Sequence, residues 1–303
     1  MKIGVVGGSG FIGSHVVEAL QAAGHELTVF DIMKPHLNDV HHVYVDITNL
    51  GRTTVAITEK FDAVYMLAAM ADVNHVHINP VESIEVNVLA VANVLEACRR
   101  SKAGRLILAS TVWVYETALE QEADESTPLA IHNVRHLYTA SKLSAELLCH
   151  SYQKLYGVDF TILRYGVPYG PRARGPTVVS NFVRKAVRGE PLQLFGDGNQ
   201  YRSFIYAADL AAGNVAALSD AAVNGTFNLE GPRPVTIREI AESVRAMIGD
   251  HVKIETVPAR PGDFGGRILT SAKATETFGW KPKVDFQDGL RAYYDWFLKE
   301  ERR

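Results

Sequence analysis

The chain contains 303 residues, of which 47% are hydrophobic and 21% charged, and its formal net charge at pH 7 is −3. That length and apolar fraction suit a globular protein with a large core in one or two domains. The small negative charge argues against nucleic acid or an anionic membrane as a partner, and no apolar run is long enough to span a bilayer.

The N-terminus places a glycine cluster between a short β-branched run, residues 2–6, and an apolar-periodic segment, residues 11–23. This order predicts a buried parallel strand, a tight turn at Gly7 and a helix. Gly10 lets the backbone approach a pyrophosphate, and Gly13 lets the helix pack closely on the strand. Because the first turn of a helix has unpaired N–H groups, we expect a dinucleotide-binding turn formed by Gly7, Gly10, Phe11, Ile12 and Gly13.

A second strand is predicted over residues 26–31 and ends at Asp31, 18 residues after Gly13. A carboxylate about 20 residues beyond the glycines bonds the ribose 2′-hydroxyl and repels a 2′-phosphate, so Asp31 favours NAD over NADP. Lys34 is the nearby cation that would favour NADP. A third strand is expected to end near Tyr44, with Asp46 and Ile47 placed to meet the adenine ring. The alternative for Asp46 is a solvated loop carboxylate.

Further strands are predicted over 62–66, 105–109 and 159–163, and apolar helices over 80–101 and 139–156. Repeated βαβ order implies a doubly wound parallel sheet, which binds ligands at the carboxyl ends of its strands. In this arrangement Leu67, Ala68, Ala69, Ser110, Thr111 and residues 164–167 lie just past strand ends. We expect a dinucleotide-binding domain over 1–165. Residues 166–303 would form mainly a smaller α/β substrate-binding lobe, from which about 201–228 would return to the first domain.

Tyr138 and Lys142 lie four residues apart and therefore share one face of the predicted helix. A tyrosine titrates near pH ~10, which is too high for a base at neutral pH, and a neighbouring cation lowers that pKa. Thr111, on a separate segment, could complete the site with a second hydroxyl. The alternative is an exposed tyrosine and lysine on an amphipathic helix.

Cysteine and histidine usage gives no sign of a metal centre. Cys98 and Cys149 both fall in predicted helices, which suggests neither a disulfide framework nor a metal site. The histidines near residues 36–42 and 75–77 do not form a ligand set. Since a predicted cofactor strand begins at residue 2, we expect no signal peptide and a cytoplasmic enzyme.

Together these residues resemble the extended short-chain dehydrogenases/reductases, and more narrowly the NAD-dependent nucleotide-sugar epimerases and dehydratases. The resemblance rests on Gly7-x-x-Gly10-x-x-Gly13, Asp31, Leu67-Ala-Ala, Asn87-Val, Ser110-Thr111-x-x-Val-Tyr115, Tyr138-x-x-x-Lys142, Leu163-Arg-Tyr, Gly196-Asp-Gly with Arg202, and Arg260-Pro-Gly-Asp263. It covers nearly the whole chain and implies a Rossmann domain with NAD.

The resemblance also implies residue roles. Tyr138 would be the base at the sugar hydroxyl, Lys142 would bond the nicotinamide ribose, and Thr111 would orient the substrate oxygen. Asn87 would contact the cofactor side, with a buried helix amide as the alternative. Arg202 and Arg260 would hold the nucleotide diphosphate, because guanidinium groups suit phosphate oxygens; surface ion pairs with Asp209 or Asp263 are the alternative. The two apolar helices would form a homodimer interface.

Departures from the family pattern separate its activities. The dehydratases carry Asp-Glu where this chain has Val112 and Trp113, and the UDP-glucuronate decarboxylases carry Glu at position 113. Without an acid there, neither reaction has its second proton-transfer group. Glu116 replaces a glycine, and Gly166-Val167 replaces Phe-Asn, so the pocket floor is reshaped.

The leading hypothesis is a nucleotide-sugar 4-epimerase acting through a transient 4-keto sugar. The alternative is an NAD(P)H-dependent 4-ketoreductase of a 4-keto-6-deoxyhexose nucleotide. A third hypothesis, a catalytically silent dinucleotide sensor, is disfavoured because a sensor has no need of the Thr111, Tyr138 and Lys142 set.

Overall fold

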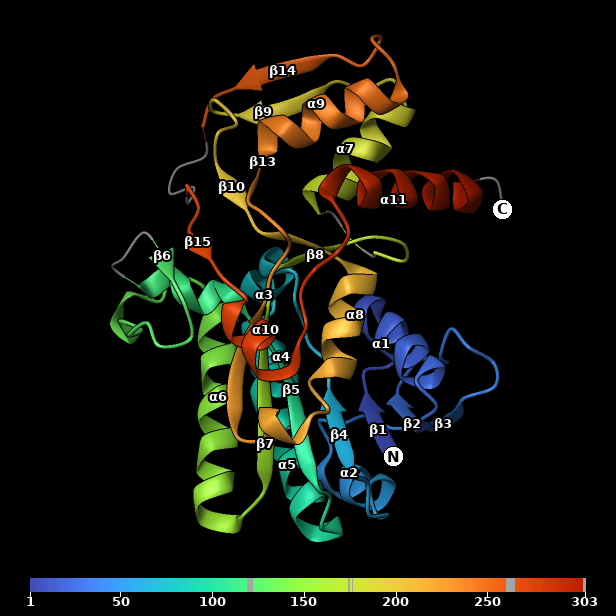
Figure 1. Cartoon of the computed structure of the whole chain (residues 1–303), viewed down its shortest axis with the longest axis vertical. Helices are drawn as coiled ribbons and strands as arrows, with labels where there is room; N and C mark the ends of the chain where they lie inside the picture. Colours follow the sequence, from blue (N-terminus) through green and yellow to red (C-terminus); the bar gives the residue numbers. More distant parts are fainter. Residues whose placement is uncertain (119–121, 174, 176, 260–264, 302–303) are drawn as a thin grey trace.

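A seven-stranded parallel sheet forms the larger part of the molecule, in a computed structural model that describes residues 1–118, 122–173, 175, 177–259 and 265–301 (Figure 1). The strand order is β12-β7-β5-β4-β1-β2-β3. The strands are β1 (Lys2–Val6), β2 (Glu26–Asp31), β3 (His41–Tyr44), β4 (Ala63–Met66), β5 (Arg105–Thr111), β7 (Asp159–Tyr165) and β12 (Gly225–Leu229). The predicted doubly wound sheet is therefore confirmed.

Helices cover both faces of the sheet because successive strand side chains point to opposite sides. Val5 packs with α1 (Phe11–Ala22) and α8 (Ala207–Ala216) in one buried cluster. The next residue, Val6, packs in a second cluster on the other face. That face is covered by α2 (Leu50–Ala56), α5 (Ala90–Ser101) and α6 (Leu137–Tyr156).

The helix expected over residues 80–101 is not uniform. It consists of α4 (Pro80–Ile84), a π-helical turn η1 (Glu85–Leu89) and α5. Asn87 lies inside the π turn, and its amide pairs with the backbone of Met70 in the loop after β4. Wider turns of this kind are frequently found at functional sites.

Two expected strand ends are wrong by two residues. Ser110 and Thr111 belong to β5, and Arg164 and Tyr165 belong to β7, because the parallel pairing continues to the register Thr111 with Tyr165. Tyr165 is also in register with Leu229 of β12. The carboxyl edge of the sheet therefore begins at Val112, Gly166 and Glu230.

The smaller lobe is built around its own buried cluster. It contains β9 (Leu192–Phe195) paired with β14 (Ile254–Val257), β10 (Tyr201–Arg202) paired with β13 (Val235–Thr236), and helices α7 (Val178–Val187), α9 (Ile237–Ile248) and α11 (Phe286–Glu301). Shorter pairs, β8 (Val167–Tyr169) with β11 (Phe204–Tyr206) and β6 (Glu122–Ala123) with β15 (Ile268–Leu269), lie between this lobe and the sheet (Figure 1). Within 201–228, β10 stays with the lobe, while α8 packs on the sheet domain.

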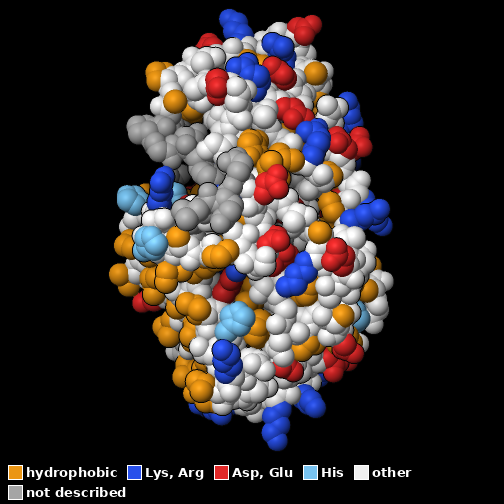
Figure 2. Space-filling model, turned by 60° about the vertical axis from the view of Figure 1, so that its left-hand side comes forward, with side chains coloured by type: hydrophobic (Ala, Val, Ile, Leu, Met, Phe, Trp, Pro, Cys, Tyr) orange, Lys and Arg blue, Asp and Glu red, His pale blue; other side chains and the backbone are white. Residues whose placement is uncertain are grey.

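Exposed apolar side chains gather on one side of the sheet domain (Figure 2). They come from α3 (Val73–Ile78), α4 and η1, which lie beside α6, and from α6 itself. The most exposed are Ile78, Val81, Leu147 and Leu155. No helix in the described part of the chain is long and apolar enough to cross a membrane.

Candidate active site

The turn between β1 and α1 fits a phosphate group. Gly7 has φ +82°, and a Cβ on it would lie 2.4 Å from the backbone nitrogen of Ala68. A Cβ on Gly13 would lie 2.0 Å from the Gly7 oxygen, so the helix can pack here only with glycine. Gly10 caps α1 without a side-chain hydrogen bond. The N–H groups of the first helical turn therefore remain available to an anion.

Asp31 holds the end of β2 beside this turn. Its Oδ2 accepts a hydrogen bond from the Ser9 N–H at 2.9 Å, and its Oδ1 accepts one from the Met33 N–H at 2.9 Å. Each carboxylate oxygen keeps a second lone pair, so these bonds leave the predicted contact with a ribose hydroxyl feasible. Ser9 also donates its hydroxyl hydrogen to the Met33 oxygen, which ties the glycine turn to the segment after β2.

The other predicted cofactor residues line the same edge. Asp46 accepts hydrogen bonds from the Thr48 N–H and hydroxyl, so its carboxylate shapes the turn after β3. Ile47 is buried in the core. The Leu67 and Ala68 N–H groups both donate to the Val6 oxygen, and Ala69 follows them in the loop after β4.

Asn87 connects this edge to the helix that carries Tyr138. Its Oδ1 accepts the Met70 N–H at 2.8 Å, while its Nδ2 donates to the Met70 oxygen and to Ser141 Oγ. Ser141 in turn donates its hydroxyl hydrogen to the backbone carbonyl oxygen of Tyr138. Since its amide is already paired in this way and only 1% exposed, Asn87 positions the loop and the helix.

Thr111, Tyr138 and Lys142 converge at the carboxyl end of β5. Thr111 Oγ1 accepts the Trp113 N–H at 3.2 Å, and the Thr111 hydroxyl lies close enough to Tyr138 to lower the pKa of its phenol. Lys142 Nζ donates to the Ala109 oxygen at 2.9 Å and lies 5.9 Å from the centre of the Tyr138 ring. The structure therefore brings together the three predicted catalytic side chains.

Burial dominates the protonation of this site. The Tyr138 side chain is only partly exposed, and burial raises its pKa to about 12, although the bond to Thr111 opposes the rise. Burial lowers the pKa of Lys142 to about 8, opposed by the negative Glu146. The expected lowering of the tyrosine pKa by the lysine is not seen in the protein alone: burial raises the Tyr138 pKa, and the group that opposes the rise is Thr111.

A buried network of polar side chains around Glu146 and Arg164 lies next to the site, and the sequence analysis did not predict it. Glu146 forms a bidentate ion pair with Arg164, with nitrogen–oxygen distances of 3.0 and 2.7 Å, and accepts a hydrogen bond from the Ser110 hydroxyl. Arg164 also donates to the Tyr115 hydroxyl, which donates to Asn228. Arg164, expected at the ligand edge, is therefore held inside the protein. The available signal was spacing, because Glu146 lies four residues beyond Lys142 on the same helix face.

The departures at positions 116 and 166 have specific structural partners. Glu116 Oε1 accepts the Arg135 N–H at 3.3 Å, and its Oε2 lies 3.8 Å from His136 Nε2. A Cβ on Gly166 would lie 2.7 Å from the Ser203 oxygen and 3.1 Å from Glu230 Oε2. The carboxyl group of Glu230 thus borders the position where a side chain on residue 166 would begin.

Of the two arginines predicted to bind phosphate, the structure describes only Arg202. Arg202, in β10, donates from Nη1 to the Tyr201 oxygen at 2.7 Å. Asp209, its suggested ion-pair partner, instead accepts the N–H groups of Lys283 and Val284 through Oδ2. Arg260 lies outside the described residues, so its role stays a prediction.

Within the ranges that the structure describes, no group of three or more histidine, cysteine, aspartate or glutamate side chains could hold a metal ion.

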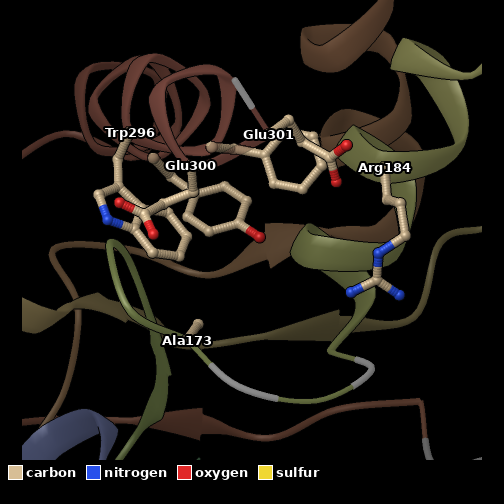
Figure 3. A pocket seen from close by; sticks show the side chains of 7 residues that line it. Ala173, Arg184, Trp296, Glu300 and Glu301 are labelled. Carbon is tan, nitrogen blue, oxygen red and sulfur yellow. The ribbon is translucent and has the colours of Figure 1, made fainter. Parts of the chain in front are cut away.

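A hollow on the smaller lobe lies apart from this site, between α7 and α11. Arg184 lines it from α7, and Trp296, Glu300 and Glu301 line it from α11 (Figure 3). Its described lining contains none of the predicted site residues.

Comparison with known proteins gives consistent matches over the chain. A family model described as "NAD dependent epimerase/dehydratase family" matches residues 3–229. UDP-glucuronic acid decarboxylase 1 of Arabidopsis thaliana is 36% identical over 298 residues, covering 96% of this chain and 68% of that protein. The chain thus spans about two thirds of the length of this relative, and it covers 66% of UDP-glucuronic acid decarboxylase 2 from the same plant.

Solved structures match over almost the whole length. The UDP-glucose 4-epimerase of Thermotoga maritima with UDP-glucose has a TM-score of 0.91 at 28% identity, covering 99% of this chain and 100% of that chain. The UDP-glucose 4-epimerase of Thermus thermophilus in complex with NAD has a TM-score of 0.85 at 33% identity, covering 98% of this chain and 99% of that chain.

Proposed function

The chain belongs to the NAD-dependent epimerase/dehydratase family, and on that premise we propose that it is a 4-epimerase of a nucleotide sugar. The observation that carries the proposal is the convergence of Thr111, Tyr138 and Lys142 at the carboxyl edge of the sheet, with no carboxylate directly after the threonine. Inversion at C4 needs one base at one hydroxyl, and these three residues supply it.

NAD is the cofactor of this family, and the glycine turn of this chain fits it. Gly7, Gly10 and Gly13 would hold the pyrophosphate, Asp31 the adenosine ribose, and Lys142 the nicotinamide ribose. When bound, NAD would supply the hydride transfer to and from the sugar carbon. Its positive ring would add to the Lys142 ammonium and lower the pKa of Tyr138 from the value that burial imposes.

Tyr138 and Thr111 would then manage the transfer of one proton, that of the C4 hydroxyl. Tyr138 takes the proton from the C4 hydroxyl, and Thr111 holds the same oxygen through its hydroxyl. After the keto sugar has turned over in the pocket, Tyr138 returns the proton to that oxygen. The sugar gains and loses the same hydride, so no net oxidation or reduction occurs.

Trp113 favours epimerisation over decarboxylation, although several relatives are named UDP-glucuronic acid decarboxylases. In the family pattern, loss of carbon dioxide or water uses an acid at one or both of the positions that follow the threonine as the second proton-transfer group. Val112 and Trp113 follow the catalytic threonine here and carry no such group.

A 4-ketoreductase is the second candidate, and the pocket floor is the observation that favours it. Gly166 and Val167 lack the amide that faces the substrate in the family pattern, and Glu230 borders the space beside Gly166. A changed floor suits a 6-deoxy sugar, which the same three residues would reduce once with exchangeable NADH.

The proposal is tested with purified protein, UDP-glucose and no added nicotinamide. We expect released NAD after acid treatment and formation of the 4-epimer, followed by NMR. Tyr138→Phe should lose epimerisation while keeping NAD, whereas Tyr152→Phe on the same helix should keep both. Consumption of NADH only with a 4-keto sugar would favour the ketoreductase instead.

We also propose that the apolar side of the sheet domain forms a homodimer. Ile78, Val81, Leu147 and Leu155 are between 64% and 73% exposed and come from neighbouring helices. Single exposed apolar side chains are normal on a protein surface, whereas a group of them on neighbouring helices marks an interaction site. Self-association across a two-fold axis would bury this group.

A further inference from the structure

A carboxylate and an imidazole meet between the two segments that carry the catalytic hydroxyls. Glu116 lies in η2 (Val112–Thr117), which begins directly after Thr111, and His136 lies two residues before Tyr138. Glu116 Oε2 is 3.8 Å from His136 Nε2. The Glu116 side chain is 11% exposed and the His136 side chain 42% exposed, so the carboxylate is enclosed and the imidazole is open to solvent or ligand.

Two further contacts fix this pair relative to the site. Glu116 Oε1 accepts the N–H of Arg135, which holds the segment that leads into α6. The His136 ring meets the edge of Trp113 at 5.8 Å and 71° between the ring planes. The Trp113 N–H in turn donates to Thr111 Oγ1. The imidazole is therefore in contact with both segments that carry Thr111 and Tyr138.

Inversion at C4 does not require Glu116 or His136. That reaction moves one proton at one oxygen, and Tyr138 and Thr111 already surround that oxygen. A carboxylate beside one ring nitrogen of an imidazole orients the ring and leaves the other nitrogen available for proton transfer. The arrangement is that of a general base with its orienting group.

A keto sugar provides a second proton that a base can remove, because a C–H bond beside a carbonyl group is far more acidic than the same bond in the parent alcohol. We propose that His136, oriented by Glu116, exchanges a proton at a carbon next to the C4 carbonyl, and so allows inversion at C3 or C5 in addition to C4. The inference rests on the proposed function only for the origin of the ketone.

The step balances without a further reagent. The C–H bond breaks, its proton goes to the free nitrogen of His136, and its electron pair forms the enolate. Thr111 and Tyr138 donate hydrogen bonds to the enolate oxygen. Return of a proton from the imidazolium to the same face restores the ketone with its original configuration. Return after the sugar has turned over in the pocket, as it does in the C4 reaction, gives the opposite configuration.

The test supplies the ketone directly. NAD-loaded enzyme is incubated in D2O with UDP-4-keto-6-deoxyglucose, and deuterium at C3 and C5 is followed by NMR against a buffer blank. General acid–base catalysis contributes roughly 100-fold or more, so His136→Gln should slow the exchange by about that factor. Glu116→Gln should slow it less, because the imidazole remains.

His132→Gln is the matched control, since His132 is exposed on η3 (Ile131–Asn133), four residues before His136. It should exchange deuterium like the original protein. Binding of the keto sugar, measured by titration, should change less than about threefold in His136→Gln, which separates a chemical role from a structural one. Melting temperatures of all variants are compared to confirm folding.

The outcomes are distinct from those of the proposed function. Exchange no faster than the blank, or undiminished in His136→Gln, overturns this inference even if UDP-glucose is epimerised at C4. Exchange that depends on His136 in a protein that does not convert UDP-glucose supports this inference and contradicts the 4-epimerase proposal.

Discussion

Glu230 gives the sharpest physical prediction, because a buried carboxyl group should make the protein's stability fall with rising pH. Glu230 directly follows β12, and its side chain is 2% exposed. Within the described residues neither of its carboxylate oxygens has a hydrogen-bond partner of normal geometry. Burial raises its pKa to about 8, the nearby Ser203 hydroxyl opposes the rise, and the charge of Glu125 adds to it.

The direction in which stability changes with pH follows from comparing the Glu230 pKa in the folded and unfolded chains. The pKa of this carboxyl is 4.5 in its ordinary state and about 8 in the folded protein. Below pH 4.5 both states are protonated and the folded state is not penalised. As the pH rises towards 8 the unfolded state releases the proton first, so stability falls by about 1.4 kcal/mol per pH unit and by about 5 kcal/mol over the window.

Glu230→Gln removes the titration and keeps the size of the side chain. The buried amide still lacks partners, which costs roughly 1–3 kcal/mol at every pH. The readout is therefore the change with pH: relative to the original protein, the variant should gain several kcal/mol of unfolding free energy between about pH 5 and pH 8. Urea titrations across this pH range measure it.

Glu242→Gln, at an exposed position on α9, is the control and should show the same pH dependence as the original protein. Equal pH dependence of the original protein and Glu230→Gln would refute the reasoning. That result would mean that water or structural relaxation solvates the carboxylate in the folded state.

Three further predictions concern the cofactor and the surface. Gly13→Ala places a Cβ 2.0 Å from the Gly7 oxygen and should abolish bound NAD, measured by acid release; retained NAD would contradict the phosphate assignment. Asp31→Ala should weaken NAD binding and raise the affinity for NADP relative to NAD in titrations, and an unchanged ratio would remove Asp31 from the ribose site. The double variant Leu147→Glu, Leu155→Glu should be a monomer in sedimentation experiments that show a dimer of the original protein; a dimer with both charges present would move the interface elsewhere.

Local patterns predicted the parts of the fold that depend on neighbouring residues. The glycine turn, its flanking strand and helix, and the position of Asp31 at the end of β2 could all be read from spacing, because backbone sterics fix them within a few residues. The Tyr138–Lys142 pair was readable for the same reason, since four residues separate neighbours on one helix face.

Features that depend on distant residues were not readable. The π turn at Asn87 is associated with its pairing to Met70, and β5 and β7 extend to Thr111 and Tyr165 because they pair with each other. Arg164 was assigned to the ligand edge because its partner, Glu146, lies on a helix that the strand meets only in the folded protein.

The central claim is tested most directly by the purified protein and UDP-glucose in the absence of added nicotinamide. The account predicts NAD released by acid and conversion of UDP-glucose to its C4 epimer, with the conversion lost in Tyr138→Phe. A protein that holds NAD but leaves UDP-sugars unchanged, or a Tyr138→Phe variant that is as active as the original, would contradict it.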